Sequence, residues 1–173
     1  MSKYLFDTET IEKDLIILLS IVFLSKFNHQ LLDKFVDKEL LTIHFTEGFI
    51  IQEKLISTSI NLRMIDDEFK EQDKKFMLPH EIVGNLFINN RQQRKLDLRE
   101  ACNKVIHAKK FISQTEPTGG IRRFQYYLPI IKFDGFHGSD YWTVELEIEK
   151  YVCNGLSLIK QYDDDWDISS RQD

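Results

Sequence analysis

The longest periodic stretch of the chain runs from Glu39 to Glu71, where apolar side chains recur every three or four residues. This spacing puts them on one face of an α-helix, which turns once in about 3.6 residues. Gly48 lies inside the stretch and disfavours one unbroken helix. Pro and Gly are scarce, at 3 and 7 of 173 residues, so we expect long helices rather than a loop-rich fold.

The segment before this stretch is also expected to be helical, from Asp7 to Phe27. It is apolar nearly all round between Leu15 and Leu24, which predicts a central place in the core. That apolar run is about half of the roughly 20 residues that a membrane-spanning helix needs, so we expect no membrane insertion. Four further helical segments are predicted, at Gln30–Lys38, Pro79–Ile88, Leu96–Lys110 and Glu149–Tyr162.

The pattern changes period after Thr118-Gly119-Gly120, which is typical of a turn. The segment Phe124–Phe133 is aromatic and β-branched, and Tyr141–Ile148 alternates apolar with polar residues. A period of two is typical of a half-buried strand, so an antiparallel β-hairpin is predicted at about residues 122–148. The expected fold is therefore mainly α: one domain over residues 1–162, a helical bundle with a C-terminal β-hairpin and a final helix.

Charge and cysteine content point to an ordinary cytoplasmic protein. The net charge is −5, of which −4 lies in residues 163–173, an acidic segment that we expect to be a disordered tail. The nearly neutral remainder lacks the footprint of a protein that holds DNA by charge alone. Cys102 and Cys153 are expected to be buried free thiols in a reducing compartment. No ligand set for a metal or cofactor is evident.

The segment Leu98–Ala108, LREACNKVIHA, contains the best candidates for a chemical site. Arg99, Asn103 and His107 are each four residues apart, so they share one flank of a helix. An imidazole can move a proton near neutral pH, and a guanidinium can stabilise charge on a phosphate. The alternative is an ordinary solvated helix flank. A basic cluster lies along the same part of the chain and could contact an RNA backbone: Arg91, Arg94, Lys95 and Lys104.

Other polar residues are interpreted as structural. Arg63 is expected to form a salt bridge with Asp66 and Asp67 within one helix, although it could instead project into the same cleft as His107. His44 is expected to be packed in the interior. His80 and His137 are expected to be loop residues.

The Asn103–His107 segment resembles the signature of the HEPN superfamily of helical-bundle domains. That signature is an arginine, a polar residue that is often asparagine, and a histidine a few residues later, on a late helix. The resemblance implies a metal-independent RNA endonuclease of bacterial anti-phage defence or of a toxin–antitoxin system. It also implies a homodimer whose two motifs face one cleft, and catalytic roles for His107, Asn103 and Arg99.

The sequence departs from that signature at one position. The family arginine immediately precedes the polar residue, where this chain has Cys102, and Arg99 lies one helical turn earlier. Either Arg99 substitutes from the same flank, or the domain has no nuclease activity. In the second case it is expected to serve as a binding or assembly module for a partner effector or antitoxin protein.

Overall fold

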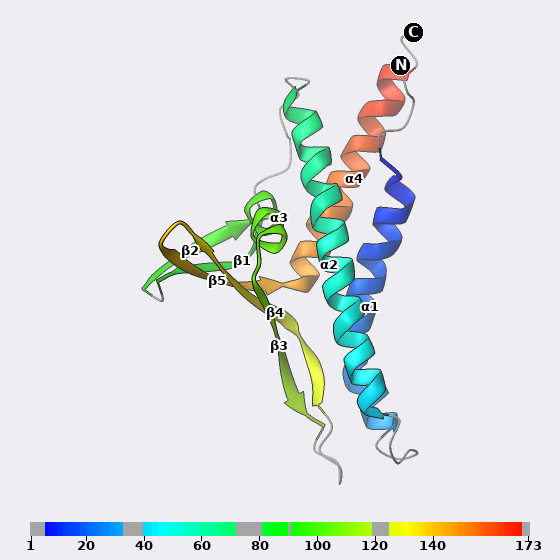
Figure 1. Cartoon of the computed structure of the whole chain (residues 1–173). Coiled ribbons are helices and arrows are strands. Elements are labelled where there is room, and N and C mark those ends of the chain that lie inside the picture. Colours follow the sequence, from blue (N-terminus) through cyan, green and yellow to red (C-terminus); the bar gives the residue numbers. More distant parts are fainter. Residues whose placement is uncertain (1–5, 33–39, 72–80, 90, 119–124, 171–173) are drawn as a thin grey trace.

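The computed structural model describes residues 6–32, 40–71, 81–89, 91–118 and 125–170. Long helices occupy the two ends of the chain, and five strands and one short helix lie between them (Figure 1). In chain order the elements are α1 (Thr8–Leu32), α2 (Leu40–Glu71), β1 (Ile82–Ile88), β2 (Gln92–Asp97), α3 (Leu98–Ile106), β3 (Lys110–Pro117), β4 (Gln125–His137), β5 (Asp140–Glu147) and α4 (Ile148–Ser170).

The five strands form one antiparallel sheet in the order β2-β1-β5-β4-β3. The helices α1, α2 and α4 pack together beside this sheet, and α3 lies between α2 and the strands (Figure 1). Helix α4 begins directly where β5 ends, so the last strand continues into the helical layer without a loop. The chain is therefore an α/β arrangement of a helical layer on an antiparallel sheet.

The prediction of a mainly helical bundle with one β-hairpin was wrong. The expected hairpin is present as β4 and β5, but it forms part of a larger sheet. The segment expected to be the helix Pro79–Ile88 is strand β1 over Ile82–Ile88, hydrogen-bonded on both sides by β2 and β5. Gly84 explains the close approach of β1 and β5, because a Cβ at this position would overlap the backbone oxygen of Glu145.

Four other predictions also differ from the structure. Helix α1 does not end at Phe27 but continues to Leu32. The expected helix Leu96–Lys110 is split: its first residues end β2, α3 covers Leu98–Ile106, and β3 begins at Lys110. The acidic segment was expected to be a disordered tail, but from residue 163 to residue 170 it is helical and continues α4. The helix around Gly48 is unbroken, as α2, and Gly48 allows the Tyr127 hydroxyl to lie against its backbone. Residues 33–38, 79, 80 and 119–124 of other predicted segments lie outside the described residues.

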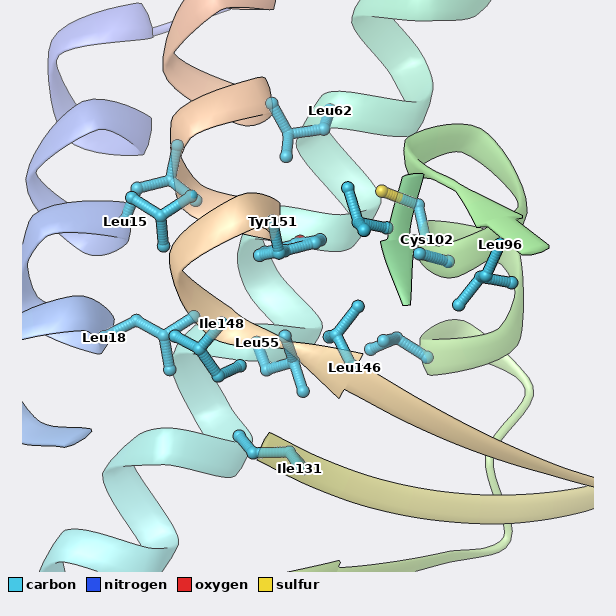
Figure 2. Close-up of a cluster of buried hydrophobic side chains, with 14 of the residues drawn as sticks. Leu15, Leu18, Leu55, Leu62, Leu96, Cys102, Ile131, Leu146, Ile148 and Tyr151 are labelled. Carbon is cyan, nitrogen blue, oxygen red and sulfur yellow. The ribbon is translucent and has the colours of Figure 1, made fainter. Parts of the chain in front are cut away.

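The main core lies between the helical layer and one face of the sheet (Figure 2). Tyr151 of α4 is at its centre, fully buried, with Leu55 of α2 and Leu146 of β5 nearby. Its hydroxyl lies 2.8 Å from the Ser59 Oγ and 3.1 Å from the Thr58 Oγ. These contacts join α4 to α2 through buried hydrogen bonds, which is how a polar tip is accommodated in an apolar core.

Helix α1 is not central in the core, contrary to the prediction. Its inner face is buried, as Leu15 and Leu18 show, but its outer face contains Phe23 and Phe27 at 53% and 62% exposure. An apolar circumference indicates a central helix only when other elements surround it on all sides. Here α2, α4 and β4 pack on one side of α1. The cysteine prediction also holds only for Cys102, because Cys153 is exposed.

Candidate functional site

The short helix α3 positions most of the candidate residues. Asp97 is its N-cap, and the Asp97 carboxylate accepts a hydrogen bond of 2.8 Å from the backbone N–H of Glu100. Ala101, Cys102 and Val105 are buried and attach the helix to the core. The helix therefore presents one flank, with Arg99 and Asn103, to α2, and ends at His107, its C-cap residue.

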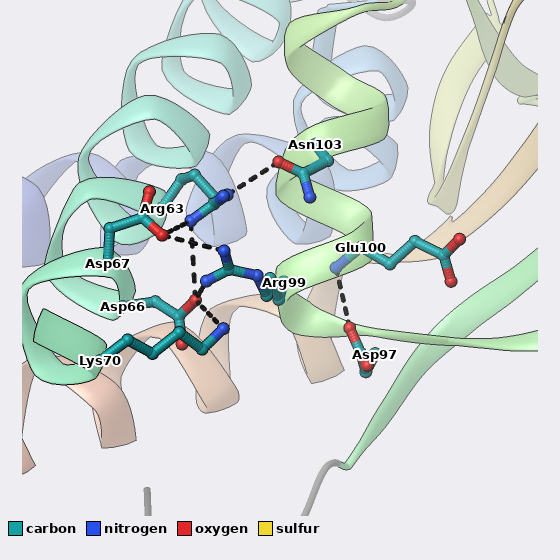
Figure 3. A network of polar contacts seen from close by, with 8 residues as sticks. All are labelled: Arg63, Asp66, Asp67, Lys70, Asp97, Arg99, Glu100 and Asn103. Carbon is teal, nitrogen blue, oxygen red and sulfur yellow. Dashed lines mark hydrogen bonds and ion pairs between the residues drawn. The ribbon is translucent and has the colours of Figure 1, made fainter. Parts of the chain in front are cut away.

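A charged cluster joins α2 to α3 (Figure 3). We call it the α2–α3 cluster. Within α2, Arg63 pairs with Asp66 at 3.8 Å and also with Asp67, which confirms the predicted intrahelical salt bridge. Arg99 of α3 pairs with both carboxylates, with Asp67 at 2.8 Å. The five members are Arg63, Asp66, Asp67, Lys70 and Arg99, and Lys70 lies 3.1 Å from Asp66.

The α2–α3 cluster has one more cation than anions. It contains three cationic side chains and two carboxylates, all partly buried or intermediate in exposure except the half-exposed Lys70 and Asp67. Burial, followed by the charge of Arg63, lowers the pKa of both Lys70 and Arg99. Burial and the neighbouring charge of Arg63 disfavour the charged forms of Lys70 and Arg99, and ion pairs with the carboxylates of Asp66 and Asp67 offset this cost.

Asn103 contacts the α2–α3 cluster and also lines a groove near the C-terminal end of α3. The Arg63 Nε donates a hydrogen bond of 2.8 Å to the Asn103 Oδ1 (Figure 3). Because the carbonyl oxygen of the amide is held by Arg63, its Nδ2 is the end available to another acceptor. Asn103 also lines the groove. Arg63 therefore sets the orientation of an amide donor at a concave surface.

This groove, which we call the α3 groove, has a volume of about 690 Å³. It lies between the C-terminal end of α3 and the turn that joins β4 to β5. It presents two exposed imidazoles, His107 and His137, together with the amide of Asn103. The remaining lining residues are Glu100, Lys104, Ile106, Ala108, Lys109, Phe136 and Trp142.

Aromatic residues form part of the α3 groove. Trp142 is 2% exposed, and the ammonium of Lys104 lies 4.6 Å from the centroid of its ring. Gly135 makes room for the indole, because a Cβ there would overlap it. Burial lowers the pKa of Lys104. Phe136 is 59% exposed, so the groove offers an apolar ring as well as cations and imidazoles.

The predicted site residues are divided between these two regions. Asn103, His107 and Lys104 line the α3 groove, whereas Arg99 belongs to the α2–α3 cluster and does not line the groove. The remaining basic residues lie at β2, an edge strand, where Arg94 pairs with Glu100. Arg91 precedes this strand, and Lys95 is exposed on it. The three residues expected in one row on the helix flank are therefore divided between the α3 groove and the α2–α3 cluster.

Sequence reasoning missed the part of the groove contributed by the sheet. His137 was expected to be an isolated loop residue, but it ends β4 and lines the groove with His107. Phe136, Lys109 and Trp142 were not candidates either. The only signal in the sequence was the turn motif DGFHGSD, which places a histidine and an aromatic residue at a hairpin tip.

Within the described residues, no group of three or more His, Cys, Asp or Glu side chains is arranged to hold a metal ion. None of the helices in the described part of the chain has the length and apolar character needed to cross a membrane. Comparisons with protein-family models, with curated proteins and with solved structures found no match to this chain.

Proposed function

We propose that the α3 groove binds RNA and cleaves it by a metal-independent reaction. The observation that carries the proposal is the presence of two exposed histidines, His107 and His137, in one concave site beside the amide of Asn103. Cleavage of RNA through its own 2′-hydroxyl needs one group to accept a proton and another to donate one. Two imidazoles in one groove fit that requirement better than either histidine alone.

The proposed reaction uses groups of this chain at each step. One imidazole takes the proton of the 2′-hydroxyl as its oxygen forms a bond to phosphorus. The bond from phosphorus to the 5′ oxygen breaks, and the second imidazole gives its proton to that leaving oxygen. The products are a 2′,3′-cyclic phosphate and a 5′-hydroxyl, so atoms and protons balance. Asn103, oriented by Arg63, would donate a hydrogen bond to a phosphate oxygen, and Lys104 and Lys109 would attract the backbone.

Arg99 has a different role in this proposal from the one that the sequence predicts. It pairs with Asp66 and Asp67, so it holds α3 against α2 rather than contacting the substrate. It is a positioning residue that keeps Asn103 and His107 at the groove. RNA is the proposed partner, and a cytoplasmic defence or toxin–antitoxin system is the proposed setting.

The proposal is tested by incubating the purified chain with a short RNA in the presence of EDTA. We expect cleavage, lost in His107→Ala and His137→Ala and weakened in Asn103→Ala. The matched substrate is the same oligonucleotide with one 2′-deoxy nucleotide at the cleaved position, which lacks the nucleophile and should stay intact. The new ends should be a cyclic phosphate and a 5′-hydroxyl by mass spectrometry. Equal cleavage by the wild type and both histidine variants would refute the proposal.

A second candidate function is a binding or assembly module without catalysis. The pairing of both arginines with Asp66 and Asp67 favours it, because neither guanidinium is then left to stabilise a phosphate. The two candidates differ in RNA binding. A nuclease should bind a non-cleavable 2′-deoxy analogue through Lys109, so Lys109→Ala should weaken that binding and Lys160→Ala, an exposed lysine on α4, should not. Absence of both binding and cleavage would favour the assembly module and a partner effector.

A further inference from the structure

The outer face of α1 exposes six large apolar side chains in one helix. The largest are Phe23 and Phe27, at 53% and 62% exposure. We call this surface the α1 outer face. It consists of Ile16, Ile17, Phe23, Leu24, Phe27 and Leu31. Single exposed apolar residues are normal on a soluble protein, but a contiguous patch of this kind marks an interaction surface.

The α1 outer face has the spacing of a helix-pairing seam. Ile17, Leu24 and Leu31 are each seven residues apart, and Ser20 and Phe27 lie three residues after the first two of them. A repeat of seven with apolar residues at its first and fourth positions is the pattern by which two helices interlock their side chains. The inner face of α1 has the same spacing, in Leu15, Leu18 and Val22, and is buried inside the chain. Only the outer seam has no helix of this chain packed on it within the described residues.

The size of the face suits an interface between two proteins. Six side chains of this size at these exposures present about 600 Å² of apolar area. A stable interface buries roughly 800 Å² on each partner, and somewhat more than half of that buried area is apolar. A helix laid along α1 would therefore supply the central part of an interface of ordinary size.

We infer that the occupant of the α1 outer face is the same face of a second copy of this chain. The face is self-complementary, because Ser20 is the one polar residue among its seam positions and no charge would meet a like charge at its centre. In an antiparallel pair centred on the face, Phe23 lies opposite Leu24 of the second copy and Ile16 opposite Leu31, so apolar side chains meet along the seam.

A lipid surface fits this face less well. Helices that lie on membranes have lysine and arginine beside the apolar face, which attract anionic headgroups. The N-terminal part of α1 instead contains Glu9, Glu12 and Asp14 against the single cation Lys13. Glu9 pairs with Lys13 and Asp14 pairs with Lys54, so this end of α1 has no excess of positive charge to attract such headgroups.

Pairing through α1 would leave the α3 groove open in both copies. Helices α1 and α3 lie on opposite sides of α2 (Figure 1). The inference is thus independent of the proposed RNA cleavage, since a dimer of this kind can form whether or not the groove is active. It also predicts that the two grooves lie far apart rather than facing one cleft.

The test is the mass of the full chain in solution, by sedimentation or by light scattering, over a range of micromolar concentrations. We expect a dimer for the wild type and a monomer for the double variant Leu24→Glu, Phe27→Glu. Both residues are more than half exposed, so the variant should fold, and an unchanged circular dichroism spectrum checks this. The matched control is Phe136→Glu, which alters a side chain of 59% exposure outside α1 and should stay dimeric.

A second measurement keeps the test decisive if the charged variant folds poorly. The thermal midpoint of a dimer rises with protein concentration, whereas that of a monomer does not. We expect this dependence in the wild type and its loss in the milder variant Leu24→Ala, Phe27→Ala. A monomeric wild type would overturn the inference. A monomer that co-sediments with vesicles of anionic lipid would overturn it in favour of a lipid surface as the occupant. A dimer that persists in the folded double variants would overturn it as well.

Discussion

Removing one hydroxyl from the centre of the core tests how the helical layer is held together. The change is Tyr151→Phe, which keeps the ring and its burial. In the fold, the Thr58 hydroxyl donates to the Lys54 carbonyl oxygen at 2.7 Å, so it can accept from the Tyr151 hydroxyl at 3.1 Å. The Tyr151 oxygen can in turn accept from Ser59 at 2.8 Å. The three hydroxyls thus form one directed chain of hydrogen bonds.

The magnitude follows from which groups lose their partners. In Tyr151→Phe, Thr58 keeps the Lys54 carbonyl oxygen as its acceptor, whereas among the described residues Ser59 is left with the neighbouring Cys102 thiol, which is a weak acceptor. A buried donor left unsatisfied costs about 1–3 kcal/mol, so we expect a loss of about 1.5 kcal/mol in the free energy of unfolding. For a chain of this length that is a decrease of roughly 3–6 °C in the thermal midpoint.

The assay is urea unfolding followed by circular dichroism, with the slope against urea compared between variants. Ser59→Ala in the Tyr151→Phe background removes the unsatisfied hydroxyl and should recover part of the loss, which a double-mutant cycle measures. An unfolding free energy of Tyr151→Phe within about 0.5 kcal/mol of the wild type would refute the reasoning, because that is the range of neutral surface substitutions. Strictly additive effects of the two substitutions would refute it too.

Two further predictions concern pH and close packing. Burial raises the pKa of the Cys102 thiol from 9.0 to about 12, so the unfolded chain loses this proton first and stability falls as pH rises through that window. Cys102→Ala should flatten this fall in urea titrations at pH 8 to 11, while Cys153→Ala, which alters an exposed thiol, should leave it unchanged. Gly84→Ala would press a Cβ into the Glu145 backbone oxygen and should lower the free energy of unfolding by at least about 1–3 kcal/mol. Gly155→Ala, whose Cβ would meet flexible leucine side chains at 3.0 and 3.1 Å, should cost less, and equal unfolding midpoints for the two variants would contradict this argument.

Much of the helical layer was predictable because the information lies within each helix. The spacing of apolar residues located α2, and the separation of Arg63 from Asp66 and Asp67 predicted their ion pairs. Period-two alternation likewise predicted β5 and its pairing with β4. Asp97 was expected near the start of a helix and is the N-cap of α3. Each of these features depends on residues close together in sequence.

The strands β1, β2 and β3 were not predicted, because short segments of mixed character do not distinguish a strand from a helix. Ile82–Ile88 becomes a strand by pairing with β5, more than fifty residues later, and the charged β2 is an edge strand where such residues are tolerated. Local sequence contains no record of those partners. The fold class was therefore wrong even though several of its elements were right.

The candidate site divides in the same way. The sequence by itself determined that Asn103 and His107 lie four residues apart at one short helix, because helical spacing is a local property. Only the tertiary structure decided that Arg99 pairs with carboxylates of α2, and that His137 joins His107 in the α3 groove. It also decided that, among the residues the structure describes, one apolar face of α1 has no element packed on it. Burial and long-range contacts depend on how the elements pack, and packing is a property of the whole chain rather than of any segment.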